Sequence, residues 1–117
     1  MEHSSEDLWR LVFQTLKPKD AESPQGCLNR LVRERVPDKT LNVDARTATI
    51  CKEIWRTSDL RSLKRKHDRM NEEDDRRPIV VVDYRNERLV IDGNHRVNRW
   101  LLASPIPEHE VLLIAIK

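Results

Sequence analysis

The chain has 117 residues, which fits one domain with a modest apolar core. Its 22 basic and 20 acidic residues leave a net charge of +2, which is not the bulk signature of a dedicated nucleic-acid binder. The acidic N-terminus has no apolar run after it, and the longest apolar run, 111–116, is too short to span a membrane. We therefore expect a soluble cytoplasmic protein without membrane association. Cys27 and Cys51 lack metal-ligand spacing, and each is expected to be a buried, reduced thiol.

Two helices are predicted at the N-terminus. The first follows Ser4 and Ser5, which are good helix caps, and it ends before Pro18. The second is shorter and is closed by Pro37. We interpret residues 1–37 as a helical extension that packs on, or flanks, the rest of the chain. The apolar stripes at helical spacing are Leu8, Leu11, Val12 and Leu16 in the first helix and Leu28, Leu31 and Val32 in the second.

The next segment is predicted to form a short strand and then two helices. Residues 40–43 alternate polar and apolar side chains, as a strand does. Asp44 is placed to cap the first helix, and Ser58 is placed to cap the second. The apolar faces are Thr47, Ile50, Cys51, Ile54 and Trp55 in the first helix and Leu60, Leu63, His67 and Met70 in the second.

Two blocks of charge, 64–66 and 72–77, lie between this region and the C-terminal part. They are typical of a solvated helix face that continues into a flexible acidic loop. A basic surface for nucleic acid is the alternative, although the nearby acidic residues weaken its long-range field. The residues that would face DNA are Arg61, Lys64, Arg65 and Lys66.

A β-hairpin, a helix and a last strand are predicted to complete the chain. Pro78 precedes the β-branched run 79–82, Asn86 favours a turn, and 88–91 forms the returning strand. Residues 110–116 form the last strand. The helix between the hairpin and that strand carries an apolar face of Val97, Trp100 and Leu101 and ends before Pro105.

The turn 92–96, with the sequence DGNHR, is the predicted functional site. Gly93 allows a positive φ or a close approach to a ligand. The first N–H groups of the following helix lie at the positive end of its dipole, where phosphate commonly binds. His95 and Arg96 add donors and positive charge. Asp92 is unfavourable near a phosphate unless it holds Arg96, a metal ion or a substrate hydroxyl.

Each residue of this turn also has a simpler explanation. Asp92 and Gly93 form a common turn signal, Asn94 is a good helix cap, and Arg96 is placed to pair with Asp92. His95 alone is typical of a surface histidine. Found together between a buried strand and an amphipathic helix, they favour a functional site. The expected phosphate-binding residues are Gly93, Asn94, His95 and Arg96.

The segment PIVVVDYRNERLVIDGNHRVNRWLLA resembles the core of the ParB/sulfiredoxin-like superfamily, in which two strands lead into a DG-x-HR turn that opens a helix. The resemblance covers about 40–116. It implies an α+β domain over 38–117, with a small mixed sheet and flanking helices. It also implies binding of a nucleoside triphosphate such as ATP or CTP, with Mg²⁺ held largely through phosphates and waters.

Superfamily activities include ATP-dependent repair of oxidised cysteine, CTP hydrolysis, phosphorylation of free serine and a proposed nuclease activity. Asn94 stands where sulfiredoxins carry a reactive cysteine, which argues against the repair reaction. Centromere-binding ParB proteins carry a helix-turn-helix module after this domain, and since the sequence here stops at Lys117 we expect no sequence-specific DNA binding by that route. The free-serine kinases place an acidic residue before the first helix of the module, and Asp44 holds a comparable place. A plain helix cap explains Asp44 equally well.

Two hypotheses from different classes remain open. The first is an NTP-dependent hydrolase or phosphotransferase. In it, Asp92 orients a hydroxyl, a water or Mg²⁺, His95 and Arg96 stabilise developing negative charge, and Asp44 serves as a base. A nuclease is disfavoured, because no cluster of carboxylates able to hold two metals is evident in the sequence.

The second hypothesis is a non-catalytic regulatory module that binds DNA or a protein partner, with nucleotide as a switch or absent. Trp9 and Phe13 would then be exposed aromatic contacts. Binding to DNA would depend strongly on salt. No metal cluster is evident among the four histidines, which are His3, His67, His95 and His109.

Overall fold

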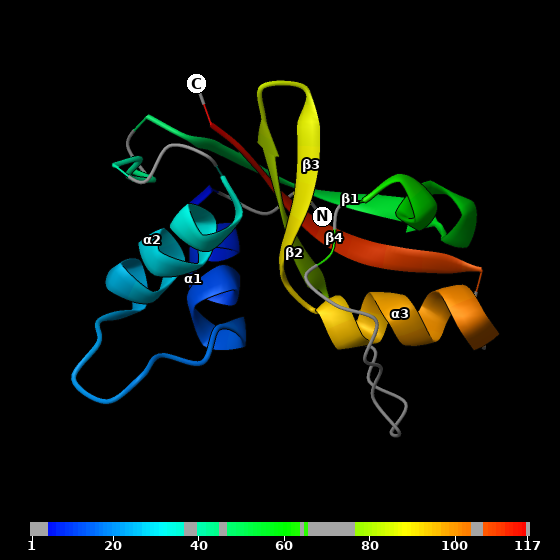
Figure 1. Ribbon diagram of the computed structural model, residues 1–117, viewed down its shortest axis with the longest axis horizontal. Coiled ribbons are helices and arrows are strands. Elements are labelled where there is room, and N and C mark those ends of the chain that lie inside the picture. The colour runs from blue at the N-terminus through cyan, green and yellow to red at the C-terminus, as the bar shows by residue number, and fades with distance from the viewer. Residues whose placement is uncertain are drawn as a thin grey trace.

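The computed structural model describes residues 5–36, 40–44, 47–63, 65, 77–103 and 107–116. Within these ranges two helices come first, and the strands follow with a 3₁₀ helix and a third α-helix between them (Figure 1). The elements are α1 (Ser5–Thr15), α2 (Pro24–Arg35), β1 (Thr49–Arg56), the 3₁₀ helix η1 (Thr57–Ser62), β2 (Ile79–Tyr84), β3 (Glu87–Asp92), α3 (Asn94–Ala103) and β4 (Glu108–Ala115).

The four strands form one mixed sheet in the order β1-β4-β2-β3. β2 and β4 are parallel, whereas the pairs β1·β4 and β2·β3 are antiparallel. In Figure 1 the sheet separates α1 and α2 from α3 and η1. The predicted α+β class, with a small mixed sheet and flanking helices, is confirmed.

Helices cover both faces of the sheet, and each face has its own core. Val80 and Val82 of β2 belong to the core under α1 and α2, whereas Ile79 and Val81 belong to the core under α3 and η1. Alternate side chains of a strand point to opposite faces, so an unbroken apolar strand suits this three-layer arrangement. The N-terminal helices therefore pack directly on the sheet. Their buried side chains are Leu8, Trp9, Val12, Cys27, Leu28 and Val32.

The predicted helix over 47–55 is wrong, because this segment contains β1. Ile50 pairs with Ile114 and Trp55 with His109 along the whole antiparallel ladder with β4. Ile50 and Trp55 are buried on opposite faces of the sheet, as their odd spacing requires in a strand. The helical spacing of the apolar residues was compatible with either structure, and pairing with a distant strand decided between them.

The predicted strand over 40–43 is also wrong. The backbone N–H of Val43 donates to Asn29 Oδ1 at 2.7 Å, and its carbonyl accepts from Gln25 Nε2 at 2.7 Å. Side chains of α2 thus satisfy the backbone that a neighbouring strand would otherwise bind. The carbonyl of Asp44 accepts from the N–H of Ala48 at 2.8 Å, and the next element that the structure describes is the strand β1, so the helix that Asp44 was expected to cap is not there.

The helix predicted after Ser58 is shorter than expected. It is the 3₁₀ helix η1, which ends at Ser62, and His67 and Met70 lie outside the described residues. The capping hydrogen bond at its N-terminus involves Asp59 and not Ser58: the Asp59 carboxylate accepts from the N–H of Arg56 at 3.0 Å. The helical spacing of the apolar residues therefore led to a prediction that was too long for this helix.

The fold settles the expected exposure of Trp9 and of the two cysteines. Trp9 is only 6% exposed and Phe13 stacks beside it with 6.0 Å between ring centroids, so the expected pair of exposed aromatics is wrong for Trp9. Cys27 is buried as expected, but Cys51 is exposed on β1. Within the described ranges, we find no helix with the length and apolar character needed to cross a membrane.

Candidate functional site

The turn after β3 begins with an irregularity in the strand. Val81 pairs with Val90 and Val80 with Asp92, so Ile91 is an extra residue in β3. Such a bulge bends a strand and redirects the residues beside it. Gly93 follows with φ +100°, and a Cβ atom there would lie 2.6 Å from Ile79 Cγ2. The predicted possibility of a positive φ at Gly93 is thus realised, and the contact with Ile79 leaves no room for a side chain there.

Helix α3 starts directly after this glycine. Its first residue is Asn94, and the first intrahelical bond runs from the N–H of Val97 to the carbonyl of Gly93 at 2.9 Å. The backbone N–H groups of residues 94–96 precede that bond and lie at the positive end of the helix dipole. The predicted sequence of strand, tight turn and helix start is therefore confirmed.

Arg96 is the charged group that the fold buries at this turn. Its side chain is 4% exposed, and Nη2 donates to Asp92 Oδ2 at 3.1 Å and to the Pro78 carbonyl at 3.0 Å. The pairing that offered a simpler explanation of Asp92 and Arg96 is thus present. Asp92 orients the guanidinium, so Arg96 contributes its charge to the site while part of its donor set is already engaged.

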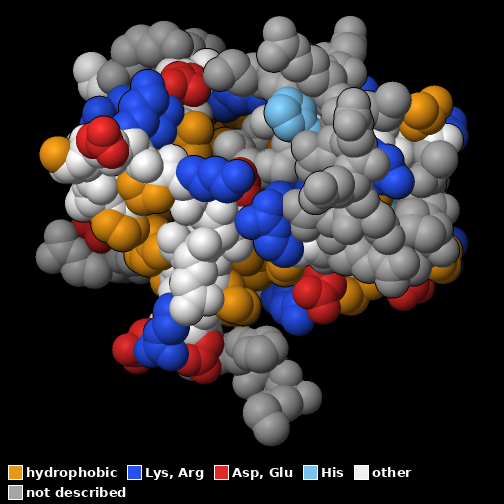
Figure 2. Space-filling view, turned by 90° about the horizontal axis from the view of Figure 1, so that it is seen from below, with side chains coloured by type: hydrophobic (Ala, Val, Ile, Leu, Met, Phe, Trp, Pro, Cys, Tyr) orange, Lys and Arg blue, Asp and Glu red, His pale blue; other side chains and the backbone are white. Residues whose placement is uncertain are grey.

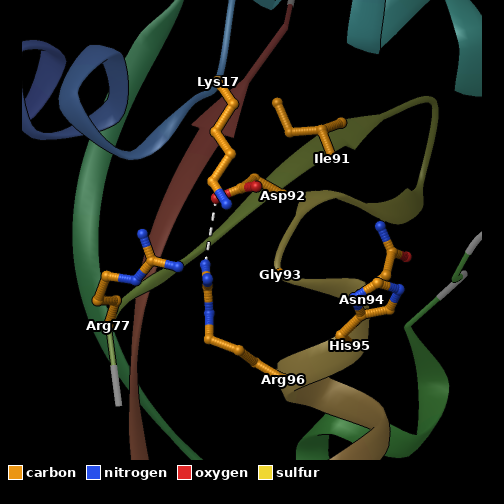
Figure 3. A pocket seen from close by; sticks show the side chains of 8 residues that line it. All are labelled: Lys17, Arg77, Ile91, Asp92, Gly93, Asn94, His95 and Arg96. Atoms are coloured by element: carbon orange, nitrogen blue, oxygen red, sulfur yellow. Dashed lines mark hydrogen bonds and ion pairs between the residues drawn. The ribbon is translucent and has the colours of Figure 1, made fainter. Parts of the chain in front are cut away.

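The turn lines a cavity of about 210 Å³. Among the described residues that line it, three are cationic (Lys17, Arg77 and Arg96) and one, Asp92, is a carboxylate. Figure 3 shows the basic side chains of Lys17, Arg77 and Arg96 directed toward the same region, beside Asp92. The lining residues are Lys17, Arg77, Ile91, Asp92, Gly93, Asn94, His95 and Arg96.

Sequence reasoning missed Lys17 and Arg77 as members of this site. Arg77 could have been found, because the hairpin places the start of β2 beside the end of β3, where Val80 pairs with Asp92. Lys17 lies on the loop between α1 and α2, far from the turn in the sequence, and no local pattern connects it to the turn.

A side chain of α2 also reaches the turn. Arg35 Nη2 donates to Asn94 Oδ1 at 2.9 Å and to the carbonyl of Val90 at 3.0 Å. Burial lowers the pKa of Arg35, because desolvation disfavours its charged form. The amide oxygen of Asn94 is therefore held by a side chain of α2.

Asp92 is the one carboxylate among the described residues that line the cavity, and the predicted base Asp44 is not among them. Among the described residues there is no group of three or more His, Cys, Asp or Glu side chains that could hold a metal ion. Mg²⁺ commonly binds through one or two carboxylates together with substrate phosphates. Asp92 is the described lining residue that could hold Mg²⁺ arriving with phosphates, although one of its oxygens already accepts from Arg96.

The predicted DNA-facing residues are only partly described. Arg61 is exposed on η1, and Arg65 Nη1 donates to Asn98 Oδ1 on α3 at 2.8 Å. Lys64 and Lys66 lie outside the described residues. Figure 2 shows basic side chains spread over one face of the molecule, with acidic ones between them. The described part therefore does not form a continuous basic stripe on this face.

Comparisons with protein-family models, curated proteins and solved structures gave no match for this chain. The resemblance to the ParB/sulfiredoxin-like superfamily accordingly rests on the strand and turn motif alone. The geometry of the pocket has to carry any functional argument.

Proposed function

We propose that this chain is a ParB/sulfiredoxin-like protein that binds the phosphates of a nucleoside triphosphate in the cavity at 92–96. The observation that carries the proposal is the convergence of Lys17, Arg77 and Arg96 on one cavity at the start of α3. These residues come from three separate segments, and the helix dipole adds positive potential at the same place. Phosphate is the common biological anion that suits such a site.

The size of the cavity supports binding of the phosphate part of a larger ligand. Its volume of about 210 Å³ is below the roughly 300–1,000 Å³ of pockets that enclose a whole drug-sized molecule. Gly93 lines the cavity, and its positive φ turns the chain so that the N–H groups of 94–96 follow directly at the helix start. The nucleoside would then lie at the rim, so the phosphates supply most of the affinity.

Hydrolysis or phosphoryl transfer is the more specific form of this proposal. His95 lines the cavity and would stabilise negative charge that develops on the transferred phosphoryl group. Asp92, held by Arg96, would orient the attacking water or hydroxyl. Mg²⁺ bound to the phosphates would supply further charge neutralisation.

Nucleotide binding is tested by thermal unfolding with ATP, CTP, GTP and ADP, each with and without Mg²⁺. A ligand at one hundred times its Kd stabilises the folded state by about 2.7 kcal/mol. His95→Ala should weaken the shift. Arg10→Ala is the matched control, since Arg10 pairs with Glu6 and Asp7 on exposed α1. Absence of a shift with every nucleotide would exclude the proposal.

A non-catalytic nucleotide-binding module is the second candidate, and the scarcity of carboxylates favours it. Asp92 is already bonded to Arg96, and Asp44 does not line the cavity. Phosphate release, measured with Mg²⁺ and with candidate hydroxyl acceptors including free serine, separates the two. Nucleotide binding with phosphate release at background would favour the module over the enzyme.

A further inference from the structure

The loop between α1 and α2 brings a lysine to the cavity of the turn. Lys17 lines this cavity together with residues of β3 and α3. Figure 3 shows its side chain extending toward Asp92, while Arg96 approaches from the other side. The N-terminal helices therefore contribute a wall of the cavity as well as a layer of the core.

The position of Lys17 is defined by packing and by an ion pair in its loop. The preceding Leu16 is 4% exposed and belongs to the same core as Ile91. Farther along the loop, both oxygens of Glu22 accept from Arg30, at 2.9 and 3.1 Å. The hydrogen bond from Arg30 holds the pKa of Glu22 at about 2, so this clamp persists across the ordinary pH range.

The same carboxylate also accepts from the backbone N–H of Lys19 at 3.1 Å, and the N–H of Glu22 donates back to the carbonyl of Lys19 at 2.9 Å. The loop is thus closed on itself between Lys17 and α2. A lysine held on such a loop loses less backbone freedom when it binds a ligand than a lysine on an unconstrained segment does.

The electrostatic environment of Lys17 is unusual for a surface lysine. Within the described ranges its ammonium makes no hydrogen bond or ion pair, although other basic residues of this segment, Arg10 and Arg30, have carboxylate partners. It lies instead beside Arg77 and Arg96, whose side chains line the same cavity. An anion that enters the cavity would face the Lys17 ammonium together with these guanidinium groups.

We infer that Lys17 is a phosphate-binding residue and that the ligand is a chain of two or three phosphates. This inference rests on the proposed function. Figure 3 places Lys17 and Arg77 on one side of the cavity and Asn94 and His95 on the other. A diphosphate or triphosphate can reach both sides, whereas a single phosphate occupies one. Such a ligand joins the N-terminal helices to the turn.

The test measures binding of inorganic phosphate, pyrophosphate and triphosphate by titration calorimetry at constant ionic strength. Lys17→Ala should weaken triphosphate binding about tenfold, the loss expected for one charge-assisted hydrogen bond. Lys19→Ala, an equal loss of charge on the same loop outside the cavity lining, should leave binding unchanged. Lys17→Arg should retain most of the affinity. Urea unfolding of each variant verifies that folding is intact.

The outcomes separate the inference from the proposed function. If the wild-type protein binds triphosphate and Lys17→Ala binds it equally well, the inference is wrong and the proposed function stands. Equal weakening by Lys17→Ala and Lys19→Ala means a general charge effect and also overturns the inference. If the wild-type protein binds no phosphate compound, the proposed function itself fails.

A second readout follows the N-terminal helices directly. Triphosphate should slow amide hydrogen exchange in α1 and α2 of the wild-type protein, because the bound ligand ties Lys17 to the turn. The Lys17→Ala variant, at a triphosphate concentration that restores saturation, should lack this additional protection while the start of α3 remains protected. Protection of α1 and α2 in both proteins would contradict the inferred contact.

Discussion

The two ends of α3 handle a buried polar side chain in opposite ways. Arg96 lies in the first turn of the helix and is 4% exposed, whereas His109 of β4, 2% exposed, stacks on Trp100 farther along it, with 4.1 Å between ring centroids. Arg96 keeps its charge beside a carboxylate and lines a cavity. His109 Nε2 shares a hydrogen bond with the hydroxyl of Thr57 at 2.9 Å.

This difference distinguishes a residue that lines a cavity, Arg96, from one that is part of the core, His109. A guanidinium stays charged in proteins, so its burial requires a partner such as Asp92 and contributes potential to the adjacent cavity. At the other end, burial lowers the pKa of His109, because desolvation disfavours the imidazolium. The neutral ring of His109 therefore supports folding, whereas Arg96 at the start of α3 presents its charge to the cavity.

The largest expected effect is that of Arg96→Ala. Removing the guanidinium leaves the carboxylate of Asp92 and the carbonyl of Pro78 without this donor. We expect a loss of roughly 3 kcal/mol in the free energy of unfolding, at the low end for a broken buried pair, since Asp92 is 26% exposed. Urea unfolding measures it. Arg10→Ala removes an exposed pair and should cost less than about 1 kcal/mol. Similar costs for the two variants would remove the distinction between these pairs.

Gly93→Ala should cause the next largest loss in the free energy of unfolding. Alanine at φ +100° is strained, and its Cβ would lie 2.6 Å from Ile79 Cγ2, so we expect a loss of about 2 kcal/mol. Gly26→Ala in α2 is the control, because the only contact near 3 Å is with the Ser23 hydroxyl, and its effect should stay within about 1 kcal/mol. Equal tolerance of alanine at both positions, again by urea unfolding, would show that the turn is not constrained as described.

The smallest effect is a pH dependence that belongs to His109. Its pKa in the folded state lies below 6.5, so below about pH 6.5 the unfolded chain binds more protons than the folded one. Stability should therefore decrease as the pH falls from about 6.5 toward the folded-state pKa, by at most about 1.4 kcal/mol per pH unit. Unfolding curves between pH 7 and 5 for the wild type and His109→Gln measure this. An unchanged slope in the variant would assign the dependence to other groups.

Local patterns predicted the hairpin and the turn well. The β-branched run became β2, and Arg85 and Asn86 adopt the positive φ values of 50° and 65° that a tight hairpin turn needs. The positive φ at Gly93 was one of the two uses that the sequence suggested for this glycine. All of these features depend on interactions between neighbouring residues, so they are visible in a short stretch of sequence.

The segment 47–55 shows where such reasoning fails. Its apolar residues fit a helical face, yet it pairs with β4, a strand near the other end of the chain. The expected exposure of Trp9 was wrong for the same reason, since the sheet that covers this side chain comes later in the sequence. Periodicity reports which residues seek an apolar environment, but it does not report what will cover them.

The sequence by itself determined the strand, the glycine turn and the helix start at 92–96, because backbone sterics and helix geometry act over a few residues. Only the tertiary structure decided what this turn faces. Packing of α1 and α2 on the sheet brings Lys17 to the cavity and Arg35 to Asn94, and hairpin pairing brings Arg77. Contacts between distant segments depend on how whole surfaces pack together, so the charge of the cavity became visible only in the folded chain.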